Sequence, residues 1–269
     1  MIPKEYRISP IGVEIIMEMP EVEIVDLEEL TPELVEERHG IIRELWWGEI
    51  WPGNLEREGS YAERYFFVEG SSPVIFTAPH AVPHDRGNYN GKNLLKPQDE
   101  FTDLIVLRVC QEAKCFGLIP LTKLRDPNVD NFDGLRATET PFLRCLEGLI
   151  SSYDIQLLLD IHGLDRKRRG VDIEIGTRYG RSLRGRREIL EQLEEHLRRE
   201  ADYLIRKNRS FIGGEIVRNI MERIPAIQLE IHRRLRDDGH SVEMERLIGI
   251  LADFVKSLPF DASFTPSRQ

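Results

Sequence analysis

The sequence has few cysteines and no apolar run long enough to cross a bilayer. Its 269 residues include only Cys110, Cys115 and Cys145. This odd number, in segments with helical character, argues against a disulfide framework, so we expect three reduced core cysteines. A membrane span needs about 20 consecutive apolar residues, and the acidic residues 1–29 do not resemble a signal peptide. We therefore expect a cytoplasmic protein without a membrane partner.

Positive charge is also in short supply. Lysine and arginine total 37 against 47 acidic residues, and the resulting net charge of −10 makes nucleic acid an unexpected partner. Residues 166–187 are the exception, because this stretch holds nine basic residues against Asp172 and Glu174. It is either a solvated basic face or a basic loop that attracts an anionic substrate, since arginine matches carboxylates and phosphates.

Several signatures of catalysis and nucleotide binding are missing. The sequence has no Gly-x-Ser-x-Gly elbow, which leaves a serine-hydrolase mechanism poorly supported. It has no phosphate-binding loop and no dinucleotide fingerprint either. What it does have is a composition of 41% hydrophobic and 31% charged residues, which is typical of a folded chain.

The chain divides into three regions. Residues 1–62 are acidic and form an expected N-terminal extension that packs on the main domain, with a helix over 31–49 and with Trp46, Trp47 and Trp51 turned toward the body. Residues 63–260 form the main domain, and residues 261–269 are expected to be a frayed tail.

The main domain alternates strand patterns with helix patterns. We expect strands over 65–68, 74–77, 118–121, 155–162, 171–175 and 224–231, helices over 99–114, 141–151, 184–208 and 241–258, and a polar loop over 82–98. Such alternation predicts an α/β fold, with a mixed, mostly parallel twisted sheet flanked by helices on both faces.

Polar side chains end three of the apolar runs. His80 follows the first run, Asp160 and His162 end the second, and Glu230 lies near the end of the third. In open α/β sheets, catalytic groups gather at the carboxyl ends of strands. Two imidazoles and carboxylates at such positions are what a one-zinc hydrolase requires.

Each of these residues also has an ordinary structural interpretation. His80 alone is compatible with a packed polar residue, and Glu230 with a structural ion pair to Arg233 or Arg234. The third metal ligand is open on the residues alone. Five side chains after the first histidine have suitable chemistry: His84, Asp85, Asp99, Glu100 and Asp103.

Six motifs in one order resemble the N-formylglutamate amidohydrolase family, within the wider zinc carboxypeptidase-like group. The resemblance covers about residues 65–235 and implies a mixed sheet of the phosphorylase/hydrolase-like kind, with one zinc at its carboxyl edge. The motifs are Pro79-His80, Lys96-Pro97-Gln98-Asp99-Glu100-Phe101-Thr102-Asp103, Asp160-Ile161-His162-Gly163, Asp172-Ile173-Glu174-Ile175-Gly176-Thr177, Phe211-Ile212-Gly213-Gly214 and Gln228-Leu229-Glu230-Ile231-His232-Arg233.

The resemblance implies residue roles. His80 and His162 resemble the histidine ligands of one Zn²⁺ per chain, and we favour Glu100 as the carboxylate ligand. Glu230 resembles the glutamate that activates water for cleavage of an amide bond in an N-acyl amino acid or a related small carboxylate. Arg86, Arg125, Arg178 and Arg233 are candidates for holding the carboxylate of that small anionic substrate, and we favour Arg125 and Arg233.

The chain departs from the family pattern at two places. The family often has an Asp-x-Asn-Arg segment, and the expected counterpart here, residues 129–133, has no arginine. His80 is followed by Ala81-Val82-Pro83-His84 and not by a turn of small residues. Two rival functions therefore stay open: a zinc peptidase or deacylase for a larger anionic substrate, and a non-catalytic binding protein on the same fold.

Overall fold

A mixed sheet of eight strands forms the centre of the molecule in the computed structural model, which describes residues 20–48, 63–89, 92–128, 137–165, 170–236 and 241–260. The strand order is β1-β2-β6-β3-β8-β11-β9-β10. The strands are β1 (Glu21–Asp26), β2 (Arg64–Glu69), β3 (Ser72–Thr77), β6 (Cys115–Pro120), β8 (Leu157–Leu164), β9 (Ile173–Gly176), β10 (Ile205–Lys207) and β11 (Ala226–His232).

Neighbouring strands run parallel except at β2–β6 and β11–β9. The central strands β3, β8 and β11 all run parallel, so their carboxyl ends meet at one edge of the sheet. The predicted class, a mostly parallel mixed sheet with helices, is confirmed.

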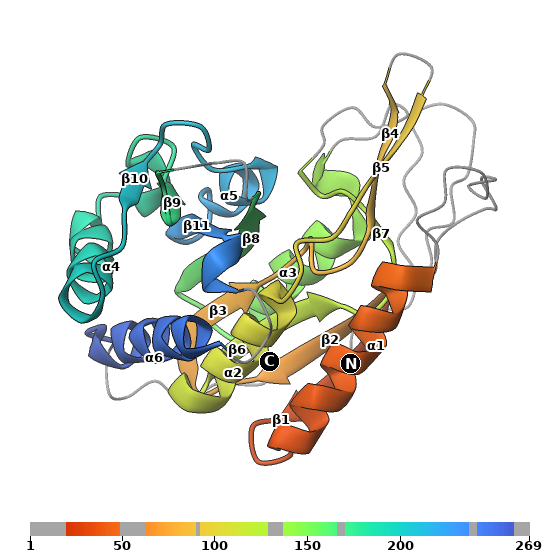
Figure 1. The fold of residues 1–269 in the computed structure, drawn as a ribbon, viewed down its shortest axis with the longest axis horizontal. Coiled ribbons are helices and arrows are strands. Elements are labelled where there is room, and N and C mark those ends of the chain that lie inside the picture. Colours follow the sequence, from red (N-terminus) through yellow and green to blue (C-terminus); the bar gives the residue numbers. More distant parts are fainter. Residues whose placement is uncertain are drawn as a thin grey trace.

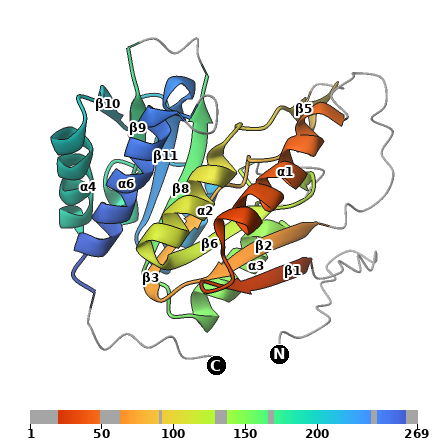
Figure 2. The same ribbon diagram turned by 60° about the horizontal axis from the view of Figure 1, so that its bottom comes forward.

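Helices cover both faces of this sheet. Helices α1 (Pro32–Gly48), α2 (Thr102–Ala113), α4 (Arg187–Glu200) and α6 (Val242–Ser257) pack into the larger core, and Figure 2 shows them in a row across one face. Helices α3 (Pro141–Ser152) and α5 (Glu215–Ile220) pack into a second core on the other face. Short 3-10 turns lie at Ala137–Glu139, Arg181–Leu183 and Arg233–Leu235.

Local sequence explains where these helices begin. The hydroxyl of Thr140 accepts a hydrogen bond from the Leu143 amide, and Pro141 occupies the first turn of α3. Ser241 caps α6 in the same way, through the Met244 amide. The predicted cap of the first helix is also present, because Thr31 Oγ1 accepts from the Leu34 amide at 3.2 Å.

The described part of the N-terminal region is joined to the main sheet and to α2. Strand β1 pairs in parallel with β2 and becomes an edge strand that the sequence pattern did not indicate. Helix α1 packs beside α2, where His39 Nδ1 lies 2.7 Å from Asp103 Oδ2 and the His39 ring stacks on Phe101. The side chains of Trp46, Trp47 and Trp51, like the tail 261–269, lie outside the described residues.

Two expected elements are wrong in the structure. Residues 82–98, expected as a loop, form the hairpin of β4 (His84–Tyr89) and β5 (Lys92–Lys96), which pairs with β7 (Leu124–Arg125) and projects away from the main sheet (Figure 1). The helix expected over 184–208 is shorter, because α4 ends at Glu200 and Ile205–Lys207 form the edge strand β10. Leu204, which extended the helical pattern, is 58% exposed and does not belong to the helix's apolar face.

The expectation for the cysteines is confirmed. Cys110, Cys115 and Cys145 are all free and buried. Among the described helices, none combines the length and the apolar character that crossing a membrane demands.

Candidate metal centre

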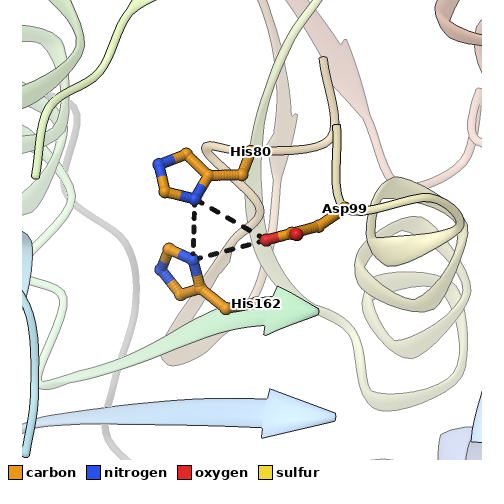
Figure 3. Close-up of side chains that lie close together, drawn as sticks. All are labelled: His80, Asp99 and His162. Atoms are coloured by element: carbon orange, nitrogen blue, oxygen red, sulfur yellow. Dashed lines mark hydrogen bonds and ion pairs between the residues drawn. The ribbon is translucent and has the colours of Figure 1, made fainter. Parts of the chain in front are cut away.

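Three side chains from separate segments meet at the carboxyl edge of the sheet. His80 lies just after β3, Asp99 just before α2, and His162 within β8. The two histidine Nδ1 atoms are 3.1 Å apart, and Asp99 Oδ2 lies 3.6 Å from His80 Nδ1 and 3.7 Å from His162 Nδ1. Figure 3 shows all three side chains directed toward one point.

This triangle fits a zinc ion. A tetrahedral zinc ion with bonds of about 2.0–2.2 Å separates its ligand atoms by about 3.3–3.5 Å. The three observed separations bracket that range. The donor set of two imidazoles and one carboxylate also leaves a fourth tetrahedral position open, as catalytic zinc sites do.

A buried carboxylate lies behind each histidine. His80 Nε2 is 2.8 Å from Asp126 Oδ1, and His162 Nε2 is 2.8 Å from Asp160 Oδ2. Because an ionised carboxylate only accepts hydrogen bonds, each Nε2 carries the proton and donates it. Both Nδ1 lone pairs are therefore available toward the centre of the triangle, as in carboxylate–histidine–zinc arrangements.

The same carboxylates make the two imidazoles stronger bases. Burial alone lowers the pKa of His162, but Asp160 and Asp99 outweigh it and hold the pKa well above its usual value. Burial likewise opposes the upward shift in the pKa of His80 that Asp126 causes. A more basic imidazole is a better metal ligand, so these contacts favour metal binding.

The structure brings Asp99, not the favoured Glu100, to the two histidines. Asp99 belongs to the group whose ligand atoms converge, and its backbone amide donates to the His80 carbonyl at 2.6 Å. Glu100, the next residue, forms an ion pair with Arg233. Asp103, another candidate, is fully buried and bound to His39.

Glu230 faces the same centre from β11, where it pairs in register with His162. It is 4% exposed, and Gln228 Nε2 donates a hydrogen bond to its Oε1 at 2.7 Å. Burial and the charge of Asp99 raise the pKa of Glu230 to about 7, although His162 acts in the opposite direction. A carboxyl group with such a pKa can both accept and return a proton near neutral pH.

The interpretation of Glu230 as half of an ion pair does not fit the contacts. Arg233, one expected partner, binds Glu100. Arg234, the other, donates to Asp172 at 2.6 Å.

A cavity of about 490 Å³ opens over the centre. His80, Asp99, His162 and Glu230 line it. Its described walls hold two cationic side chains, Arg86 and Lys96, and an apolar stretch at Phe211 and Ile212.

The favoured arginines lie elsewhere. Arg125 is 9% exposed on β7, its backbone amide donates to Glu63, and it does not line the cavity. Arg233 is likewise absent from the lining. Arg178 holds the carbonyl of Gly213 beside the cavity, and Arg86 alone of the four candidate arginines lines it.

Sequence interpretation missed Asp126 and Asn128. Asp126 is fully buried against His80, and Asn128 lines the cavity. Together they have the Asp-x-Asn order that we expected within residues 129–133, with Val129 where the family has arginine. The motif was therefore present in the sequence, shifted upstream of the segment chosen for it.

A second group of possible ligands contains His80, His84 and Asp126. The rings of His80 and His84 stack 3.8 Å apart, and burial together with the charge on His80 lowers the pKa of His84 to about 3. However, Arg86 Nε already donates to Asp126 Oδ2 at 2.6 Å. A guanidinium at this carboxylate disfavours a second cation, so the first group is the better candidate for a metal site.

Comparison with known proteins relates part of the chain to one family. Residues 137–236 match the family model described as N-formylglutamate amidohydrolase. The resemblance to that family is confirmed. This segment carries His162 and Glu230, and the match indicates an amidohydrolase. No curated protein matches the sequence.

One of the similar solved structures shows the same fold. An N-formylglutamate amidohydrolase from Ralstonia eutropha JMP134 is 14% identical with a TM-score of 0.51, over 71% of this chain and 97% of that one. A gene product of Agrobacterium tumefaciens (13% identity, TM-score 0.47, 71% and 93% coverage) and a bacteriophage poly-gamma-glutamate hydrolase (14%, 0.44, 76% and 95%) are less similar.

Proposed function

We propose that the protein is a metal-dependent amidohydrolase that holds one zinc ion through His80, Asp99 and His162. The convergence of two carboxylate-backed histidines with a third acid carries the proposal. The substrate is an N-acyl amino acid or a related small carboxylate, as the family match favours. A zinc ion held by these three residues would supply Lewis-acid chemistry, lowering the pKa of a water molecule and polarising the amide carbonyl.

Glu230 is the proton carrier of this reaction. Its Oε1 is held by Gln228, which leaves Oε2 to take the proton of the attacking water. Because its pKa of about 7 lies close to neutral pH, it then returns the proton to the leaving nitrogen. Asp126 and Asp160 keep the two histidines in the tautomer that the ligand role requires.

Arg86 and Lys96 are the proposed partners of the substrate carboxylate. They supply the positive charge among the described lysines and arginines that line the cavity, which Asp99 and Glu230 also line. Arg86 is fixed at Nε by Asp126, which orients its planar fork. This assignment replaces Arg125 and Arg233.

A larger anionic substrate is the second candidate. A cavity of about 490 Å³ falls within the range of about 300–1,000 Å³ typical of sites for drug-sized ligands. It exceeds what a formylated amino acid requires. An acylated peptide or conjugate cleaved by the same residues is therefore compatible with the cavity.

Metal content is the first test. Elemental analysis of purified protein should find about one zinc per chain, absent from the Asp99→Asn variant. Glu100→Gln is the matched control, because Glu100 is adjacent in sequence but bound to Arg233, and it should retain the metal. Failure of the wild-type protein to take up any metal would refute the proposal, and the reverse behaviour of the two variants would refute the ligand set.

Activity is the second test. We expect hydrolysis of N-acyl aspartates, N-acyl glutamates or acylated acidic peptides, with Glu230→Gln slower by about 10²–10⁴-fold at unchanged zinc content. Preference for the peptides would select the second candidate. Stoichiometric ligand binding without turnover would favour a binding protein instead.

A further inference from the structure

A buried arginine lies behind the candidate metal centre. Arg236 is 4% exposed and follows the 3-10 turn Arg233–Leu235 after β11. Its Nε donates to the carbonyl of Ile231 at 3.1 Å, and its Nη1 donates to the carbonyl of Glu100. One side chain therefore joins the strand that carries Glu230 to the loop that carries Asp99.

Gly163 provides the space for this guanidinium. The residue follows His162 on β8, and a Cβ atom placed there would overlap Arg236 Nη2 and lie 2.9 Å from the Cβ of Asp99. The absence of a side chain at this position lets Arg236 and Asp99 approach the backbone of the strand beside the metal-binding histidine. Arg236 thus contacts β8, β11 and the ligand loop together.

The charges around Arg236 explain why a cation is tolerated there. Burial lowers the pKa of Arg236, and the attraction of Asp99, Glu100 and Glu230 offsets part of this loss of hydration and of the repulsion from Arg233. Both carbonyl contacts lie within one residue of Asp99 or Glu230. A planar, multi-donor side chain suits these two acceptors in a way that a flexible lysine does not.

We propose that Arg236 is a positioning residue that fixes Asp99 as the third metal ligand, with Gly163 as the position that admits it. The inference rests on the proposed metal centre. Arg236 contributes no ligand atom. It holds the Glu100 carbonyl, and with it the preceding residue, at a set distance from β8 and His162.

Zinc affinity measured by competition with a chromophoric chelator tests this role. Arg236→Met should weaken zinc binding about 10–100-fold, the range typical of groups that orient ligands, and Arg236→Lys should lose less. Arg234→Met is the matched control, because Arg234 lies two residues away but binds Asp172, and its affinity should equal that of the wild type. Thermal unfolding of the metal-free proteins shows whether each variant is folded.

Gly163→Ala provides a route that leaves Arg236 in place. It should weaken zinc binding by a similar factor, and it should add little in the Arg236→Met background, because the displaced guanidinium is then already gone. The inference would be overturned if Arg236→Met bound zinc as tightly as the wild type. It would also be overturned if the affinity loss of the double variant were the product of the two single losses. Either result would leave the proposed metal centre intact. A wild-type protein that binds no zinc would instead refute the metal centre itself.

Discussion

In each of the two candidate histidine ligands, Nδ1 faces the centre of the triangle and Nε2 contacts a carboxylate. Asp160 shows what the Nε2 contact contributes. Its Oδ2 accepts from His162 Nε2, while Oδ1 accepts from the Thr77 hydroxyl at 2.7 Å. Asp160 is therefore held in place and keeps its charge directed at the ligand. The role is electrostatic as well as geometric, because an amide of the same shape would preserve the contact but not the charge.

Asp160→Asn should consequently weaken zinc binding by about 10-fold with little effect on folding. Chelator competition measures the affinity. Asp154→Asn is the matched control, since Asp154 is exposed in the turn before β8, at a left-handed φ of 50° that asparagine accepts. Equal zinc affinity in the two variants would contradict the electrostatic role.

Glu63 gives a separate prediction about pH and stability. Burial raises its pKa from 4.5 to about 6, although Tyr65 and the Arg125 amide donate hydrogen bonds to it. A carboxyl group whose pKa is higher in the folded state stabilises the fold fully below its unfolded pKa, and this contribution is lost as the pH rises through about 6.

Glu63→Gln should abolish this loss of stability at higher pH, because glutamine does not ionise. The unfolding free energy of the metal-free variant minus that of the metal-free wild type should be about 2 kcal/mol larger at about pH 8 than at about pH 4. Urea unfolding at the two pH values measures the change. A wild-type-to-variant difference that is the same at both would show that Glu63 does not titrate as described.

At the scale of elements, the segment 210–214 forms one wall of the cavity. Glu174 of β9 lies beneath it and accepts from the backbone amides of Arg209, Ser210 and Phe211 through one oxygen. Gln228 accepts from the Gly214 amide at 2.6 Å and donates to Glu230. The wall is therefore fixed by two buried side chains, one of which also holds the proposed proton carrier.

Removing the Glu174 carboxylate should loosen this wall. Glu174→Ala is expected to destabilise the fold by about 2 kcal/mol, because three partly buried backbone amides lose their shared carboxylate acceptor, and to raise KM more than it lowers kcat. Glu174→Gln, which retains an acceptor oxygen, should recover part of both. Urea unfolding and steady-state kinetics test this, and unchanged KM in the alanine variant would contradict it.

The accuracy with which the sequence predicts a secondary-structure element differs from one element to another. The buried strands β8 and β11 could be predicted because each is an apolar run in the sequence. The polar residues near the ends of these runs identified His162 and Glu230 as candidate site residues. The hairpin 84–96 is rich in polar residues and glycine, so its pairing depends on partners that no local pattern records. Edge strands β1 and β10 are short and half-exposed, which removes the apolar signal.

The choice between Asp99 and Glu100 as the acid that faces the two histidines could not be made from the sequence, for a different reason. Asp99 and Glu100 are adjacent, chemically alike and equally suited to the start of a helix. Phe101 adopts a left-handed φ of 67° just after them. That backbone turn, together with the contacts of the Glu100 carbonyl, decides which carboxylate faces the histidines.

For the molecule as a whole, the candidate ligands come from three separate segments: the residues just after β3, the loop before α2, and β8. An unfolded chain does not hold these three groups together, so zinc should bind the folded state far better. Zinc at 100 times its dissociation constant should then add about 2.7 kcal/mol to the unfolding free energy. Thermal scans with and without zinc measure the shift, and a comparable shift in His162→Ala would refute the site.

The contacts of His39 bear on how the chain can be shortened. A protein cut before residue 63 would lose β1 and α1, which exposes the sheet edge at β2 and removes the imidazole that covers Asp103 and Phe101. Both of these residues lie within four positions of Asp99 in the sequence. A fragment that keeps these contacts therefore has to include β1 and α1, and a boundary chosen from the motifs alone would remove both elements.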